Sequence, residues 1–157
     1  MHHATSLRHA FTLPELLLSL ALTVVIMTAA AIGLHAAGVS HSASAEKTDL
    51  VARARGVVGH IAHDVRSAKS VSVANSRTLQ ITMQDDSTRT YTWDGVVGGN
   101  LTLTVNTGTP VSATLTRQVA SFSVTDNDPA VVVRLTLQGH VAKTQMSVSV
   151  MPSGKVF

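Results

Sequence analysis

The feature that most constrains this chain is a long stretch without formal charge near its N-terminus. From Leu16 to Ala45 the sequence contains no Asp, Glu, Lys or Arg, and residues 16–34, LLLSLALTVVIMTAAAIGL, are apolar almost throughout. About 20 apolar residues suffice for a helix to cross the hydrocarbon core of a bilayer. The stretch therefore predicts a membrane-spanning helix, around which the rest of the fold must be built.

A carboxylate lies at the start of this stretch. Glu15 directly precedes the apolar run, and the next charged residue is Glu46. A charged side chain at the centre of a membrane helix costs roughly 2.5–3.5 kcal/mol even on the lenient insertion scale. An apolar residue would serve an anchor better, so we expect Glu15 to have a specific role. The alternative is an acid at headgroup level that the helix dipole favours.

The composition excludes several classes of function. The 157 residues suffice for one domain with an appendage. With 12 Lys and Arg against 9 Asp and Glu, and no run of three cations, the net charge of +3 gives little support to nucleic-acid binding. The absence of Cys rules out disulfides, thiolate zinc sites and cysteine nucleophiles.

Two common interpretations of such an N-terminal region leave Glu15 unexplained. A secretory signal peptide would be cut after the small residues Ala43-Ser44-Ala45, but its apolar core is ordinarily only about 7–15 residues long. A signal anchor would keep its N-terminus in the cytoplasm, because Arg8 precedes the apolar run and Glu46 opens the other flank. Neither interpretation requires a carboxylate at position 15.

A third interpretation rests on residues 10–17, AFTLPELL. A small residue followed by Phe-Thr-Leu-x-Glu-Leu-Leu and a long apolar helix resembles the class III signal of the type IV pilin and pseudopilin superfamily. The positions of that motif are occupied in order by Ala10, where the family usually has Gly, and by Phe11, Thr12, Leu13, Pro14, Glu15, Leu16 and Leu17. The resemblance implies that a prepilin peptidase cuts between Ala10 and Phe11, and that the new Phe11 amine is methylated.

Such a cut would give Glu15 a partner. Glu15 would become the fifth residue of the mature chain, about 6 Å along a helix from the Phe11 amine. In helices packed with a stagger of that size, Glu15 of one subunit can reach the amine of the next. Opposite charges 4 Å apart attract by about 4 kcal/mol at an effective dielectric constant near 20. That attraction roughly offsets the burial of both groups, so the pair would set register more than add stability.

Beyond the apolar stretch the sequence predicts an amphipathic helical segment. Gly33, Gly38 and the small residues of 35–45 first indicate a flexible junction. Apolar side chains then recur three or four positions apart, at Leu50, Ala54, Val57, Val58, Ile61, Val65 and Ala68. His60 and Asp64 fall between them, and we expect them on the solvated side.

After residue 70 the apolar period changes to two. The alternation predicts strands at residues 78–83, 89–93, 101–105, 120–124, 131–137 and 144–150, with turns between them, one of them at 106–110. Only one face of each strand is apolar, which indicates antiparallel strands with one covered face. The amphipathic helix is the expected cover.

These parts predict an α+β fold with a long N-terminal helix packed on a C-terminal antiparallel sheet. We expect a leader (1–10), a transmembrane helix (11–39), its amphipathic continuation (40–70) and a β domain (71–157). One long helix that enters a sheet domain is the pilin arrangement, and the order of hairpin and late strands resembles minor pseudopilins of the J/PilW type. The resemblance implies a subunit of a type II secretion pseudopilus or a type IV pilus.

The resemblance also implies partners and a location. The partners would be the prepilin peptidase, other pilins or pseudopilins and an inner-membrane assembly platform, with no nucleic acid. The chain would cross the inner membrane once, with its N-terminus cytoplasmic and its β domain periplasmic, before it enters a filament. The alternatives are a monomeric signal-anchored β domain that binds a ligand such as a surface glycan, and a β domain secreted after a cut behind Ala45.

Little in the sequence indicates catalysis or a cofactor. There is no Ser/His/Asp elbow, P-loop or dinucleotide fingerprint, so no enzyme is predicted. His60, His63 and Asp64 have the helical spacing of a metal site, but a solvated helix edge explains them as well. Asp126 and Asp128 are calcium candidates, against the simpler interpretation of a turn that ends at Pro129. Asp85-Asp86 is expected at a hairpin tip.

Overall fold

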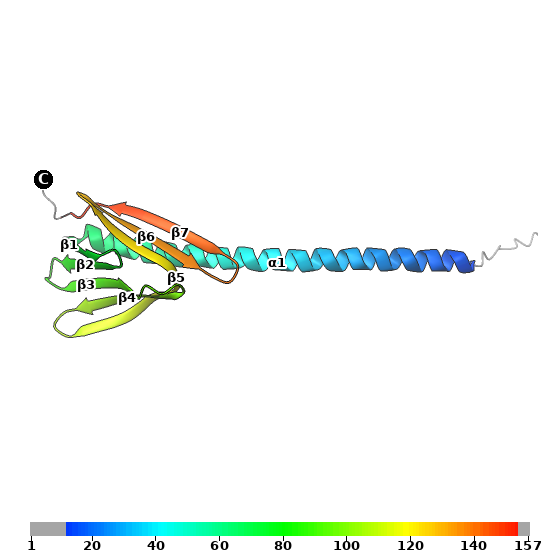
Figure 1. The fold of residues 1–157 in the computed structure, drawn as a ribbon, viewed down its shortest axis with the longest axis horizontal. Helices are drawn as coiled ribbons and strands as arrows, with labels where there is room; N and C mark the ends of the chain where they lie inside the picture. The colour runs from blue at the N-terminus through cyan, green and yellow to red at the C-terminus, as the bar shows by residue number, and fades with distance from the viewer. Residues whose placement is uncertain (1–11, 154–157) are drawn as a thin grey trace, which may run out of the picture. The chain divides into compact units, whose positions relative to one another are not determined.

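The computed structural model describes residues 12–153, so the predicted leader, Phe11 and the bond between Ala10 and Phe11 lie outside the described residues. One helix, α1 (Leu13–Arg66), precedes seven strands. The strands are β1 (Ala68–Asn75), β2 (Thr78–Met83), β3 (Thr88–Trp93), β4 (Gly99–Asn106), β5 (Pro110–Asn127), β6 (Ala130–Gln138) and β7 (Lys143–Val150) (Figure 1). The predicted α+β class, with a long helix and an antiparallel sheet, is confirmed.

The chain divides into two compact units, one ending at Ser42 and the other beginning at Ala43. In the first unit, every large apolar side chain from Leu13 to Val39 is more than half exposed. This part of α1 is long and apolar enough to cross a membrane. Its apolar surface has no cover within the described residues, so lipid or neighbouring helices must supply it.

Two predicted features of the helix are different in the structure. The backbone stays helical through Gly33 and Gly38, where we expected a junction. The helix also ends at Arg66 instead of Ser70, because residues 68–75 form the strand β1, which was not predicted. Ala68, assigned above to the helix face, is buried at the start of that strand. Ala68 follows Val65 at the helical spacing of three residues only by chance, because the helix ends between them.

The second unit is a helix-covered sheet. All seven strands pair antiparallel with their neighbours in the chain, in the order β1-β2-β3-β4-β5-β6-β7 (Figure 1). The part of α1 that belongs to this unit buries the apolar face predicted for it, with Leu50, Ala54 and Ile61 at 0% exposure. Alternate strand residues complete the core: Leu79, Ile81, Tyr91, Leu101, Phe122, Val133, Leu135 and Leu137. Burial of this shared apolar surface is what holds helix and sheet together.

Strand β5 is much longer than predicted. Its 18 residues pair with β4 through the first half and with β6 through the second, so that β5 joins the two halves of the sheet. Gln118 lies between these halves with φ at 62°, and the register with β4 shifts near the same place. A single left-handed residue with a register shift is typical of a bulge that bends a strand. The first five residues of β5 are all exposed, so this half of the strand buries little apolar surface, and it was not predicted.

Candidate functional site

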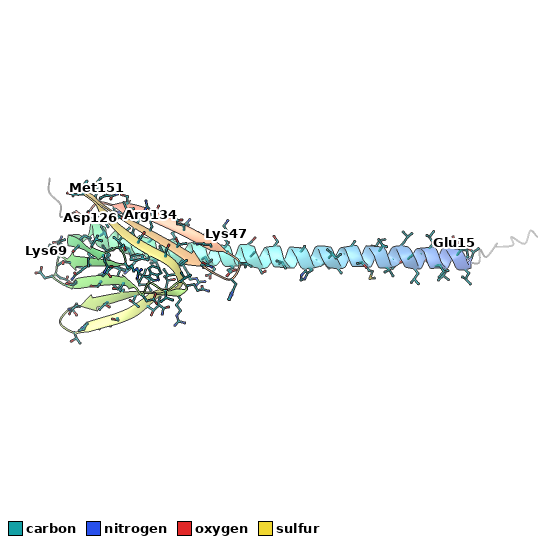
Figure 2. All side chains as sticks on the ribbon, in the orientation of Figure 1. Glu15, Lys47, Lys69, Asp126, Arg134 and Met151 are labelled. Atoms are coloured by element: carbon teal, nitrogen blue, oxygen red, sulfur yellow. The ribbon has the colours of Figure 1, made fainter. Side chains whose placement is uncertain are left out.

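The predicted signal motif is described from Thr12 onward. Pro14 and Glu15 lie in the first turn of α1, as expected, and the Leu16 amide donates to the Thr12 carbonyl oxygen at 3.2 Å. Proline is tolerated in a first turn, because its missing N–H has no helical partner to lose. Glu15 is exposed, and no hydrogen bond or ion pair to its carboxylate occurs among the described residues (Figure 2).

The other polar side chains of the apolar segment have partners within the helix. Between Leu16 and Leu34 these are the hydroxyls of Ser19, Thr23 and Thr28. They donate to the backbone carbonyls three or four residues earlier, at 2.9, 2.8 and 2.7 Å. Such bonds allow hydroxyls to sit in hydrocarbon without an outside partner. Glu15 is therefore the polar group of this segment that needs a partner from elsewhere.

A buried polar cluster lies between helix and sheet in the second unit. The Asp64 carboxylate, which is 0% exposed, accepts a hydrogen bond from Arg89 Nη1 at 2.6 Å and another from the Tyr91 hydroxyl at 2.5 Å. His60 Nε2 lies 3.9 Å from the same carboxylate, and its ring meets that of Tyr91 edge to face. The cluster ties the last turns of α1 to β3.

The cluster corrects the prediction for Asp64. We expected Asp64 on the solvated side with His60 and His63, but its side chain points into the core and is neutralised by Arg89. Among residues 12–153 no group of three His, Asp or Glu side chains is placed to hold a metal ion. The sequence signal was the presence of Arg89 and Tyr91 two residues apart on one strand, on the face that meets the helix.

Both partners of Asp64 have shifted pKa values. The hydrogen bond to the carboxylate raises the pKa of Arg89 above its usual range. Burial, helped by the hydrogen bond to Asp64, raises the pKa of Tyr91 far above its usual value of 10. A phenol that must lose its proton next to a buried carboxylate resists ionisation. The arrangement holds an anion with two donors that stay protonated, which is a structural role.

A second carboxylate from the helix binds a turn of the sheet. Glu46 accepts hydrogen bonds from the His140 and Val141 amides, at 2.5 and 3.1 Å, in the turn between β6 and β7. Gly139 lies against the same carboxylate, where a Cβ atom would collide with Oε1. Glu46 was noted in the sequence only as a flanking charge. Its contact depends on chain folding across 94 residues, which no local pattern reports.

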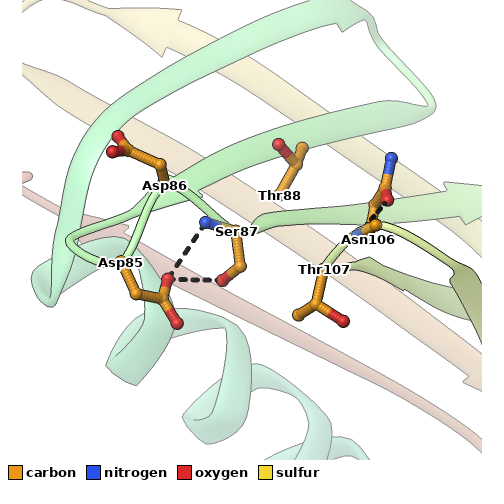
Figure 3. A pocket seen from close by; sticks show the side chains of 7 residues that line it. Asp85, Asp86, Ser87, Thr88, Asn106 and Thr107 are labelled. Atoms are coloured by element: carbon orange, nitrogen blue, oxygen red, sulfur yellow. Dashed lines mark hydrogen bonds between the residues drawn. The ribbon is translucent and has the colours of Figure 1, made fainter.

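The remaining acidic candidates lie in turns. Asp85 and Asp86 form the tip of the β2–β3 hairpin, as expected (Figure 3). Asp85 Oδ1 accepts from the Ser87 amide at 3.0 Å and from its hydroxyl at 2.6 Å, and these bonds lower the pKa of Asp85. Asp86 pairs with Lys69 at 2.5 Å. A shallow pocket of about 380 Å³ beside them is lined by the tips of two hairpins.

The calcium candidates are also part of a hairpin. Asp126 lies in β5 opposite Val131, and Asp128 lies in the short turn to β6, followed by a cis peptide bond to Pro129. The predicted turn is confirmed for Asp128 and Pro129, whereas Asp126 belongs to the strand, and the calcium prediction is not tested by this geometry.

Comparison with protein-family models, curated proteins and solved structures gave no match to this chain. Function is therefore inferred from the N-terminal motif, the helix and the sheet domain themselves.

Proposed function

We propose that this chain is a pilin-like structural subunit, a minor pseudopilin, which joins a type II secretion pseudopilus or a type IV pilus after a prepilin peptidase has cut it between Ala10 and Phe11. The observation that carries the proposal is the Glu15 carboxylate, which lies in the first turn of α1 and has no partner among residues 12–153, while the next formal charge along the helix is at Glu46. An ionisable residue at membrane depth indicates function, with a partner to be identified.

The partner in this proposal is the methylated Phe11 amine of a neighbouring subunit. Methylation keeps the amine charged, so the ion pair forms only after the leader is removed. The exposed apolar side chains of α1 from Leu13 to Val39 then pack against those of neighbouring subunits. Apolar packing alone would allow many axial staggers between the helices, and the ion pair selects one of them. The helix keeps the subunit in the inner membrane, with the N-terminus cytoplasmic and the β domain periplasmic, until assembly.

The proposal makes the processed N-terminus the first thing to measure. We expect the intact mass of the protein from its native membranes to correspond to an N-methylated chain beginning at Phe11, and an Ala10→Gly variant to be cut at least as fast. An uncut chain beginning at Met1 would instead support the signal-anchored binding module. A chain beginning at Glu46 would support the secreted β domain.

Assembly tests the role of Glu15. We expect Glu15→Gln to be cut and methylated normally but to be lost from sheared filaments by at least tenfold, because the amide cannot pair with the amine. The matched control is Asp49→Asn, which removes an exposed carboxylate from the same helix outside the apolar segment. Incorporation of Glu15→Gln at the wild-type level would show that the ion pair does not set the register.

A further inference from the structure

The β domain carries a groove that none of the features above explains. A groove of about 530 Å³ runs between α1 and β7, with Val58, Ala62, Met146 and Val148 as its apolar lining. Both walls belong to the unit that begins at Ala43. Gly59 opens the helix side, because a Cβ atom there would meet nothing within 4 Å.

The sheet side of the groove is an edge. Among residues 12–153, β7 pairs with β6 alone and is the last strand of the sheet (Figure 1). An edge strand presents backbone N–H and C=O groups to which an extended chain can add. The shape of the groove therefore suits a strand laid beside β7, with alternate side chains directed toward the helix.

Two cations flank the apolar lining. Arg55 and Arg66 line the groove on the helix side, and neither side chain takes part in an ion pair or hydrogen bond within residues 12–153. No acidic residue of the described part of the chain lines the groove. The two arginines are eleven residues apart on one helix, which corresponds to about 16 Å or about five residues of extended chain.

We propose that this groove binds an extended segment of a different protein, with about five residues of aliphatic character and an acidic residue at each end. The segment would add to the edge of β7, place aliphatic side chains over Val58 and Ala62, and pair its carboxylates with Arg55 and Arg66. A second copy of this chain does not fit, because no two of its acids flank an aliphatic run of that length. The inference concerns the β domain and does not rest on processing or on Glu15.

A photocross-link in the native host tests the proposal with the full chain. A photoreactive amino acid replaces Ser147, an exposed residue of β7 that lines the groove. We expect a cross-link to another protein, mapped by mass spectrometry to a segment with acids on both sides of aliphatic residues. A product between two copies of this chain, a segment without the two acids, or no product would each overturn the proposal.

Two glycines of α1 supply a matched pair of variants. Gly59→Leu fills the groove, whereas Gly56→Leu adds the same bulk at a position that also has open space but does not line it. We expect the cross-link yield to fall at least tenfold with Gly59→Leu and to stay within twofold with Gly56→Leu. Equal yields from the two variants would show that the groove is not the contact.

The charges are tested separately. Arg55→Glu with Arg66→Glu should lower the yield at least tenfold, because like charges then meet across the contact. Lys47→Glu with Arg117→Glu makes the same change in net charge at exposed positions outside the groove and should leave the yield within twofold. An equal loss in both pairs would overturn recognition of an acidic segment.

Discussion

Asp64 adds hydrogen bonds between helix and sheet to their shared apolar core. Its carboxylate is fully buried and has two donors, Arg89 and Tyr91, both from β3. Removal of one member of a buried charged pair leaves the other without compensation. Since Arg89 remains about one third exposed and partly solvated, we expect the loss of unfolding free energy to lie at the lower end of the range for broken buried ion pairs, about 3–5 kcal/mol.

We therefore expect Asp64→Asn to lower the free energy of unfolding by about 3 kcal/mol. The matched control is Asp49→Asn, on the same helix. Asp49 pairs with Arg53 at the surface, where such pairs contribute at most about 0.5 kcal/mol. Urea unfolding followed by circular dichroism measures both. Similar losses for the two variants would contradict a special role for Asp64.

Tyr91 predicts a loss of stability at alkaline pH. The pKa of Tyr91 is raised in the folded protein, so its contribution is complete below pH 10 and is lost as pH rises above the unfolded value. The loss amounts to about 1.4 kcal/mol at pH 11. Tyr91→Phe should lack this loss, and urea unfolding at pH 8 and pH 11 compares the two proteins.

A spectroscopic control is available because Tyr91 is the only tyrosine. Phenolate absorbance near 295 nm should stay absent at pH 10–11 in the folded protein and appear with an ordinary titration in urea. Ordinary titration without urea would show that the Tyr91 hydroxyl is not buried against the Asp64 carboxylate.

For single residues, the sequence indicated which side chains are unusual but not what surrounds them in the fold. Glu15 stands out because no charged residue follows it until Glu46. In the structure it lies in the first turn of α1, as predicted. Asp64 was misplaced because its neighbours on the helix, His60 and His63, are exposed. Its burial depends on the donors Arg89 and Tyr91, which lie 25 and 27 residues further along the chain, so the helix sequence alone does not reveal it.

Among the elements, the contact between α1 and the β6–β7 turn yields a test by double mutation. Glu46→Ala removes the two hydrogen bonds to the His140 and Val141 amides. Gly139→Ala should displace the same carboxylate, because its methyl group would occupy the place of Glu46 Oε1. Each change should lower the free energy of unfolding by about 1 kcal/mol.

The double variant decides whether the two residues act through one contact. If they do, Glu46→Ala with Gly139→Ala should also cost about 1 kcal/mol, since the second change has nothing left to displace. Chemical denaturation of the four proteins measures the coupling. Additive losses of about 2 kcal/mol would mean that Gly139 is needed for another reason.

The strands show which elements a period of two can predict. β2 and β7 were found within a residue, because apolar residues alternate along their whole length. β1 and the first half of β5 were missed, because each has few buried side chains. Pairing with β2 and β4 places them in the sheet, and Val71, Val73 and Leu115 add contacts with the core.

For the whole molecule, the division at residues 42 and 43 predicts an independent domain. Every buried core side chain lies at Leu50 or beyond, whereas the exposed apolar side chains of α1 end at Val39. A fragment that begins at Ala43 should be monomeric without detergent, and should melt within a few degrees of the full chain in detergent. Aggregation of the fragment, or a melting temperature lower by more than 10 °C, would show that the first unit supports the core.

The order of the sheet has a consequence for the way in which the β domain folds. Each strand pairs with the one made just before it, so no later strand has to be inserted between two earlier ones. Pairings between near neighbours close short loops and form quickly. The domain can therefore be completed hairpin by hairpin in the order of its sequence, and the next strand covers the growing edge each time, so that β1 and β7 remain as the two edge strands.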